Sequence, residues 1–387
     1  MIDFTRYVAE RTQYFVGRRW VFEGIHDWLA QPLGTRYFLV TGEPGSGKTA
    51  LAARLYQFSK GESSPNGFDR LGTGSISAAH FCSARDSSWV DPRTFATSIA
   101  LQLSRFPEYA LALKDAGDKS ITINVSTRVG TAEANAEIIG VVIENLDVSR
   151  LSAQDAFNRV VVDPLAAIYG NGFQPPITIL VDSLDEALTH AGEVNIVKLL
   201  SNLENLPPQV RFILTSRREE RVESKFPVAD GILLSAPEFS DHNRGDIDAY
   251  VRRRLKDDPE LSPKVAAIGN REAELLAQAI TSKAADNFQY AAFVLNAMAK
   301  GQLPLGSPQG LPPGLDGLYY GSLERAVELG KRDWAQDYAA VMGVLSVAQA
   351  TLTLAQLQDF AGQSESAVWT SPVLLSSPPF SVHFPAL

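Results

Sequence analysis

A run of eight residues near the start of the chain combines three glycines with a lysine and a threonine: Gly42-Glu-Pro-Gly-Ser-Gly-Lys48-Thr49. Glycines accept positive φ and let the backbone pass close to a ligand, so several N–H groups can point at one anion. A lysine at this spacing neutralises the β- and γ-phosphates of a nucleotide, and the hydroxyl after it ligates Mg²⁺. The run predicts a phosphate-binding loop with Thr49 as a metal ligand. The residues expected to contact the nucleotide there are Gly42, Glu43, Pro44, Gly45, Ser46, Gly47, Lys48, Thr49 and Ala50.

A second candidate group consists of carboxylates at the end of an apolar run, Ile177-Thr-Ile-Leu-Val-Asp182-Ser-Leu-Asp185-Glu186. A carboxylate at the end of a buried strand can reach the Mg²⁺ held by Thr49, directly or through water, and Asp182 has that position. A carboxylate three or four residues further on can polarise the water that attacks the γ-phosphate, and both Asp185 and Glu186 qualify. Alone, such an acidic pair is more often a charge at a helix N-terminus. The complete loop upstream favours the catalytic interpretation.

A third run, Arg211-Phe-Ile-Leu-Thr215-Ser216-Arg217-Arg218, ends in two hydroxyls and two guanidinium groups. If its strand lies beside the acidic one, its end faces the γ-phosphate, and Arg217 would sense whether that group is present. The alternative is a solvated basic turn.

The elements that must position these residues are short apolar runs separated by helical periods. Runs without alternation are typical of parallel strands covered on both faces. After the first run, Leu51, Leu55 and Phe58 share one helical face. The pattern predicts an α/β fold, a P-loop NTPase parallel sheet sandwiched by helices. The runs are Tyr37 to Val40, Ala78 to Cys82, Ile177 to Val181, Arg211 to Leu214 and Ile232 to Leu234.

Other patterns divide the chain into parts. Strict alternation from Ile121 to Ser126, followed by the apolar stretch Ile138 to Ile143, predicts an inserted antiparallel hairpin near 120–144. We expect the P-loop domain at 1–239, a helical domain at 240–300, a Pro- and Gly-rich linker at 301–316, and a winged-helix-like domain at 317–387 that ends within or just after the winged helix. Long helical stretches are expected at Glu272 to Lys300 and Tyr319 to Ala350, a short helix at Thr353 to Ala361 and a hairpin at Val373 to Phe384.

Composition excludes several classes of protein. The net charge of −9 argues against general nucleic-acid binding, which requires a clustered positive surface. The single cysteine, Cys82, excludes an intrachain disulfide framework and a cysteine zinc cluster, and it fits a reducing compartment. No signal-peptide core and no apolar stretch of membrane-spanning length is present, so we expect a cytoplasmic protein that does not bind membranes.

Several motifs together resemble the STAND class of signalling NTPases, and specifically its NACHT-like bacterial members. The similarity covers about residues 14–325. The motifs are Phe15-Val-Gly17-Arg18, the phosphate loop, Leu180-Val-Asp182-Ser-Leu-Asp185-Glu186, Leu214-Thr215-Ser216-Arg217-Arg218, Asp286-Asn-Phe-Gln-Tyr290-Ala and Leu311-Pro-Pro-Gly314-Leu.

The resemblance implies three domains closed around ADP at rest, with ATP exchange opening the molecule for assembly into a homo-oligomer. It implies that Val16, Gly17 and Arg18 contact the adenine and ribose, and that His383 touches the ADP β-phosphate. The chain lacks the Gly-x-Pro signature of the wider class in its helical part. An effector domain and C-terminal sensor repeats such as WD40 or TPR are expected outside this chain, which would then be the core of a larger assembly.

Three functions remain open on the sequence. The first is a regulatory switch that hydrolyses ATP slowly and oligomerises on activation, in bacterial defence or stress signalling. The second is an AAA+-type motor or remodelling ATPase. For that class we would expect an arginine supplied across a ring interface. The third is a nucleotide-binding scaffold without hydrolysis, against which the intact Asp182, Asp185 and Glu186 argue. The choice between ATP and GTP is not determined, because no base-reading motif is present.

Overall fold

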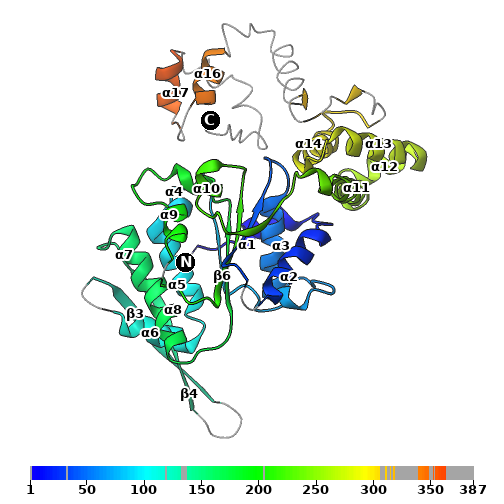
Figure 1. Cartoon of the computed structure of the whole chain (residues 1–387). Helices are drawn as coiled ribbons and strands as arrows, with labels where there is room; N and C mark the ends of the chain where they lie inside the picture. The colour runs from blue at the N-terminus through cyan, green and yellow to red at the C-terminus, as the bar shows by residue number, and fades with distance from the viewer. Residues whose placement is uncertain are drawn as a thin grey trace.

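The structure is a computed structural model of the 387-residue chain. It describes residues 2–31, 34–117, 120–131, 137–203, 205–305, 310–311, 314, 317–318, 339–347, 352 and 354–362. Figure 1 shows an α/β body built on a sheet seen edge-on, with a group of helices beside it.

The α/β body is organised by a five-stranded parallel sheet of order β2-β5-β6-β1-β7. Every residue of the central strands β5 and β6 is buried, as expected for strands covered on both faces. The predicted α/β sheet flanked by helices is therefore confirmed. The strands are β1 (Tyr37–Thr41), β2 (Ala78–Phe81), β5 (Ile177–Asp182), β6 (Val210–Ser216) and β7 (Asp230–Leu233).

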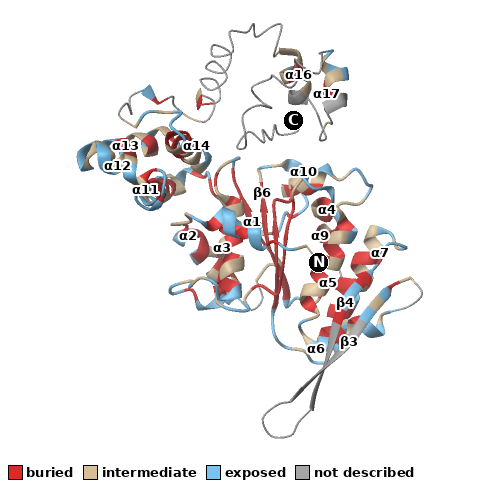
Figure 2. Ribbon diagram, turned by 180° about the vertical axis from the view of Figure 1, so that it is seen from behind, coloured by how far each residue is buried: buried red, intermediate tan, exposed pale blue. Residues whose placement is uncertain are grey.

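Each face of the sheet carries its own hydrophobic core, because successive side chains of a strand point to opposite faces. On β5, Ile179 and Val181 pack into one core and Leu180 into the other. Helices α1 to α3 cover one face and α5 to α9 the other, with the strands buried between them (Figures 1 and 2). The helices are α1 (Thr5–Thr12), α2 (Arg19–Ala30), α3 (Lys48–Lys60), α4 (Ser87–Val90), α5 (Pro92–Leu103), α6 (Pro107–Asp115), α7 (Ala153–Phe157), α8 (Asp163–Gly170), α9 (Ile196–Ser201) and α10 (Glu220–Glu223), with the short turns η1 (Asp69–Leu71), η2 (Asn158–Val162), η3 (Glu186–Thr189) and η4 (Pro237–Phe239).

An antiparallel hairpin of β3 (Thr122–Thr131) and β4 (Glu137–Asp147) projects from this body, where the alternating sequence predicts one (Figures 1 and 2). Ile121, Ile143 and Leu146 at its base are buried in the core that contains α5 and α6. The base of the hairpin is therefore anchored by the same packing that covers the sheet.

A buried histidine in β2 predicts a pH dependence of stability. His80 donates from Nε2 to the Trp89 carbonyl at 2.8 Å, and burial lowers its pKa to about 4. Its unfolded pKa is about 6.5, so the neutral ring favours the folded state, and this stability is lost as pH falls from 6.5 towards 4. We expect the free energy of unfolding to drop by about 3 kcal/mol over that range through this group. Urea titrations at several pH values would measure it.

The matched variants for that measurement are His80→Phe and His26→Gln. His26 lies outside the core, with its side chain 26% exposed, and His26→Gln serves as the control for the loss of a histidine elsewhere. His80→Phe should flatten the profile between pH 6.5 and 4, and an unchanged slope in this variant would refute the assignment.

The second group of helices has its own core, to which Ile247, Val251, Leu276, Tyr290 and Val294 contribute. Its members are α11 (Ser240–Asp257), α12 (Ser262–Ile268), α13 (Asn270–Lys283) and α14 (Phe288–Ala299).

The stretch predicted to be helical from Glu272 to Lys300 is interrupted between α13 and α14. Ala285 and Asp286 have φ of 47° and 62°, and the Asn287 side chain caps α14 by accepting from the Gln289 and Tyr290 amides. Residues with positive φ cannot continue a right-handed helix, so two helices form in place of one.

The winged-helix-like domain predicted at 317–387 is not shown. Helices α16 (Ala339–Val347) and α17 (Leu354–Ala361) pack together through Val341 and Leu357. The expected hairpin at Val373 to Phe384, His383 within it, and most of the helix expected at Tyr319 to Ala350 lie outside the described residues. In the described part of the chain, none of the helices combines the length and apolar character that crossing a bilayer requires.

Candidate functional site

The carboxyl ends of β1, β5 and β6 bring the three predicted motifs together at one edge of the sheet. Strand β6 pairs with β1 on one side and with β5 on the other. The phosphate loop follows β1, Asp182 ends β5, and Ser216 ends β6, next to Arg217. The condition set from the sequence, that the Thr-Ser-Arg strand lies beside the acidic strand, is met.

The phosphate loop has the backbone that its glycines allow. Gly45 and Gly47 have φ of 80° and 89°, and α3 begins directly after them at Lys48. The Lys48 ammonium is buried and donates to the carbonyls of Gly42 at 2.6 Å and Glu43 at 3.0 Å. Burial lowers its pKa to about 8, an effect that the charges of Asp185 and Asp182 oppose. The lysine is thus held against the loop, in position for an anion.

A set of oxygen atoms suited to Mg²⁺ lies beside the start of α3. The hydroxyls of Thr49 and Ser183 are 3.4 Å apart, and Ser183 also donates to Asp182 at 3.0 Å. The buried Asp182 carboxylate accepts a further bond from Thr215 at 2.6 Å, and burial raises its pKa. Mg²⁺ prefers oxygen ligands and is usually held by one or two carboxylates plus substrate phosphates, which these residues fit. The described residues contain no group of three His, Cys, Asp or Glu side chains that would hold a metal by themselves.

The two candidate catalytic carboxylates have different partners. Asp185 pairs with Arg217, whose Nε lies 3.1 Å from its Oδ2 and whose backbone N–H donates to its Oδ1 at 2.9 Å. Glu186 accepts a hydrogen bond from the Ala84 amide after β2 at 2.8 Å, and burial raises its pKa. Asp185 is therefore engaged in positioning Arg217, whereas Glu186 is better disposed to take a proton from water.

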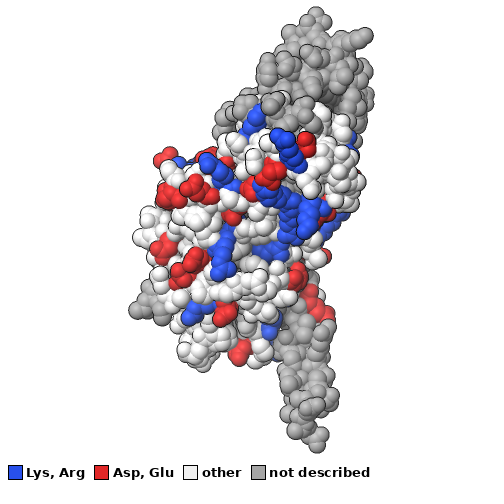
Figure 3. Space-filling view, turned by 90° about the vertical axis from the view of Figure 1, so that its right-hand side faces the viewer, with Lys and Arg blue, Asp and Glu red and all other residues white. Residues whose placement is uncertain are grey.

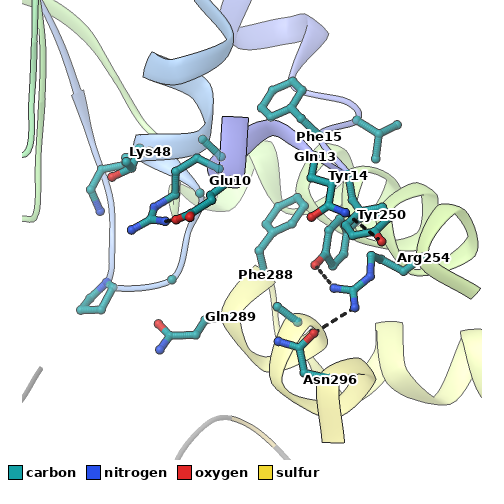
Figure 4. Close-up of a pocket in the computed structure, with 18 of the residues that line it drawn as sticks. Glu10, Gln13, Tyr14, Phe15, Lys48, Tyr250, Arg254, Phe288, Gln289 and Asn296 are labelled. Carbon is teal, nitrogen blue, oxygen red and sulfur yellow. Dashed lines mark hydrogen bonds and ion pairs between the residues drawn. The ribbon is translucent and has the colours of Figure 1, made fainter. Parts of the chain in front are cut away.

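A cavity of about 850 Å³ joins this edge of the sheet to the second group of helices. Lys48, Thr49, Asp185, Glu186 and Arg217 line its phosphate-loop end. Figure 4 shows Lys48 and Glu10 at this end and, across the cavity, a set of aromatic and polar side chains from both parts of the chain. That set comprises Tyr14, Phe15, Tyr250, Arg254, Phe288, Gln289 and Asn296.

The far end of the cavity is held by a buried arginine. Arg254 pairs with Asp258 at 2.7 Å, donates to Asn296 at 2.9 Å and to the Tyr250 hydroxyl at 3.0 Å, and lies 4.4 Å above the Tyr14 ring. Aromatic faces with a few fixed polar groups are the usual lining of a pocket for a planar ligand. Sequence reasoning missed these residues; the basic triplet that ends in Arg254 is the only sequence signal.

The residues expected to contact the base and ribose are placed at the junction of the two parts. Val16 and Arg18 line the cavity. The buried Arg18 guanidinium donates to the Ser46 carbonyl of the phosphate loop and to Asn243 of α11, both at 2.5 Å, and burial lowers its pKa to about 10. Gly17 has φ of 79°, and a Cβ there would lie 2.2 Å from an Asp246 oxygen. Arg18 is therefore a link between the loop and the helical group.

The start of α14 also touches the phosphate loop directly. Asn287 donates to the Pro44 carbonyl at 2.9 Å, and the Gln289 amide donates to the Gly45 carbonyl at 3.2 Å. A Cβ on Gly45 would lie 2.5 Å from Asn287 Oδ1. The loop and the helical group are thus in contact at the site itself.

Charge is not evenly spread over the surface. Figure 3 shows Lys and Arg side chains gathered around a hollow in the middle of one face, with Asp and Glu side chains around them. A net charge of −9 therefore coexists with a local basic region.

The sheet order and the loop after β1 define an α/β protein consistent with a P-loop-like fold. A family model described as Nephrocystin 3, N-terminal, matches residues 18–134, less than a third of the 387 residues. That similarity includes the phosphate loop and α3 and ends before the acidic strand β5. No curated protein matches the chain.

Proposed function

We propose that this chain binds ATP or ADP together with Mg²⁺ and hydrolyses ATP slowly, as a signalling switch. The observation that supports this most is the convergence of Lys48, Thr49, Glu186 and Arg217 on the end of one cavity, from three neighbouring strand ends, with the buried Asp182 directly behind Ser183 of the lining.

Each residue has a role that its chemistry supports. The loop amides and Lys48 would hold the β- and γ-phosphates, and Thr49 with Asp182 would hold Mg²⁺. Bound there, Mg²⁺ would neutralise charge on the phosphate oxygens. Glu186 would orient the attacking water and take its proton, and Arg217, fixed by Asp185, would contact the γ-phosphate.

The contact between the phosphate loop and the helical group supports the switch over a motor. Asn287, Gln289 and Arg18 tie the loop to α11 and α14, so a nucleotide in the cavity would touch both parts of the chain. A ligand shifts a conformational equilibrium only if its affinities for the two conformations differ. A nucleotide that contacts both parts of the chain in this arrangement would lose some of those contacts if the parts separated, so its two affinities would differ. In the STAND-like reading, ADP favours this closed arrangement, and ATP favours an open one that forms a homo-oligomer.

The wider biology belongs to the same proposal. The NACHT-like resemblance suggests a cytoplasmic protein of bacterial defence or stress signalling that acts with an effector domain and with sensor repeats such as WD40 or TPR. These partners rest on the resemblance alone.

The proposal is tested by the nucleotide that the purified protein retains and by its turnover. We expect denaturation and chromatography to release ADP, and the protein alone to hydrolyse ATP on the order of one per minute or more slowly, as for unassisted switch NTPases. Rapid turnover without a partner would favour the AAA+-type motor instead. Binding of ATP with no hydrolysis at all would favour the scaffold.

A further inference from the structure

The N-terminal helix α1 lies at the phosphate-loop end of the cavity, although no nucleotide motif lies within it. It packs against α3, the helix that follows the loop. Glu10 and Arg11 of α1 line the same cavity as Lys48 and Glu186, and Figure 4 shows Glu10 near Lys48, across the cavity from Arg254.

Aromatic packing fixes the position of α1 relative to the sheet. The buried Phe4 ring lies 5.0 Å from Phe81 of β2 and 4.9 Å from Trp89 of α4. The Tyr7 ring lies 5.5 Å and 5.2 Å from the same two rings. Because both rings hold one side of α1 against the sheet, the direction in which the neighbouring side chains of α1 project is also fixed.

Arg11 extends from this fixed helix over Tyr7. Its Cζ lies 4.4 Å from the centre of the Tyr7 ring, and its side chain is 37% exposed, compared with 93% for Arg6 one and a half turns earlier. Glu10 pairs with Arg6 at 2.8 Å and approaches Arg11 only to 4.0 Å. The Glu10 carboxylate is therefore held more closely by Arg6 than by Arg11, and the Arg11 guanidinium can turn to a ligand in the cavity.

Tyr7, with Arg11 over it, lies near the acidic strand end, because its ring is 5.5 Å from Phe81, which pairs in register with Asp182. Burial raises the pKa of Tyr7, and the charges of Asp182 and Glu186 raise it further, whereas Arg11 lowers it. Charges interact more strongly in a buried, low-dielectric setting than in water, so the Tyr7 hydroxyl is sensitive to the carboxylates expected to serve Mg²⁺ and the attacking water.

We infer that Arg11 contacts the terminal phosphate of a bound nucleoside triphosphate from within the same chain, with Tyr7 holding its guanidinium in place. The inference rests on the proposed nucleotide binding. A guanidinium fork binds phosphate oxygens through paired, charge-assisted hydrogen bonds, which a diphosphate cannot supply at the γ position. Arg11, Lys48 and Arg217 would then surround that phosphate from α1, α3 and the end of β6. Helix α1 would thereby distinguish the triphosphate from the diphosphate state.

The test compares two nucleotides on matched variants of the full chain. Affinities for the β,γ-imido analogue of ATP and for ADP, each with Mg²⁺, are measured by calorimetry for the wild type, Arg11→Gln and Arg6→Gln. We expect Arg11→Gln to weaken the triphosphate analogue by about tenfold or more and to leave ADP nearly unchanged. Arg6→Gln should match the wild type for both nucleotides, because Arg6 points to solvent.

Equal weakening of both nucleotides, or of neither, in Arg11→Gln would overturn the inference. Arg11→Lys keeps the charge without the fork and should recover part of the lost affinity. Thermal unfolding without nucleotide checks that each variant is folded. A wild type that binds neither nucleotide would instead refute the proposed function, so the two failures are distinguishable.

Discussion

Lys48→Ala is expected to reduce the affinity for ATP and for ADP by about 100-fold or more, the largest binding effect that one substitution should have in this chain. The reason is that Lys48 is the one ammonium group held inside the phosphate loop, 2.6 Å from the Gly42 carbonyl. In the presence of phosphates it would exchange these carbonyls for charged oxygens, which bind an ammonium more strongly. Calorimetry or equilibrium dialysis with each nucleotide and Mg²⁺ would measure the loss.

The control for this experiment lies on the same helix. Lys60 ends α3 at the surface, with its ammonium 5.2 Å from the Tyr56 ring, and Lys60→Ala should bind nucleotides as the wild type does. Without nucleotide, Lys48→Ala should unfold at nearly the wild-type temperature, because its lost hydrogen bonds are offset by removal of a buried charge. The stabilisation that saturating ATP gives the wild type should be absent. Unchanged affinity in a folded Lys48→Ala protein would refute nucleotide binding at this loop.

The parts of the fold that the sequence predicted are those where burial leaves a direct pattern. Strands β5 and β6 are buried along their whole length, so they read as unbroken apolar runs. The edge strand β7 is exposed at Asp230 and Gly231, and its predicted bounds, Ile232 to Leu234, were accordingly displaced from the observed Asp230–Leu233. The hairpin was predicted because its first strand alternates and an apolar stretch follows it. The break before Asn287 was not predicted, although Asp286 and Asn287 are residue types that favour positive φ and helix N-caps, because helix-favouring alanines surround them.

For the site, the sequence predicted residues that carry a local motif and missed those that tertiary packing supplies. Lys48, Asp182 and Arg217 lie at the ends of β1, β5 and β6, and their meeting was predicted on the condition that the Thr-Ser-Arg strand lies beside the acidic one. The contacts of Arg254 with Tyr14 and of Asn287 with Pro44 join segments about 240 residues apart, and one sequence offers no signal for such pairs. Arg11 belongs to the same class. Its role depends on how α1 packs on α3, which amphipathic spacing alone does not determine.

Glu186→Gln is expected to lower ATP turnover by about 100-fold to 10,000-fold while leaving the affinity for ATP nearly unchanged. Glutamine has the same length and can still accept the hydrogen bond from the Ala84 amide, which is 2.8 Å in the native protein. It cannot take a proton from the attacking water. Single-turnover measurements of radiolabelled phosphate release at saturating ATP separate this chemical step from binding, and Glu193→Gln at an exposed position serves as the control.

Asp185→Asn decides between the two candidate bases. In the native protein Asp185 accepts a hydrogen bond from the Arg217 backbone N–H at 2.9 Å and pairs with the Arg217 side chain at 3.1 Å. Both oxygens of the Asp185 carboxylate are therefore already engaged with Arg217. An asparagine retains the backbone bond and loses the ion pair, so we expect turnover to fall less than in Glu186→Gln. The affinity for the triphosphate should fall more, because Arg217 is then less firmly directed. A larger loss of turnover in Asp185→Asn than in Glu186→Gln would assign the base to Asp185 and make Glu186 the residue that positions water against the Ala84 loop.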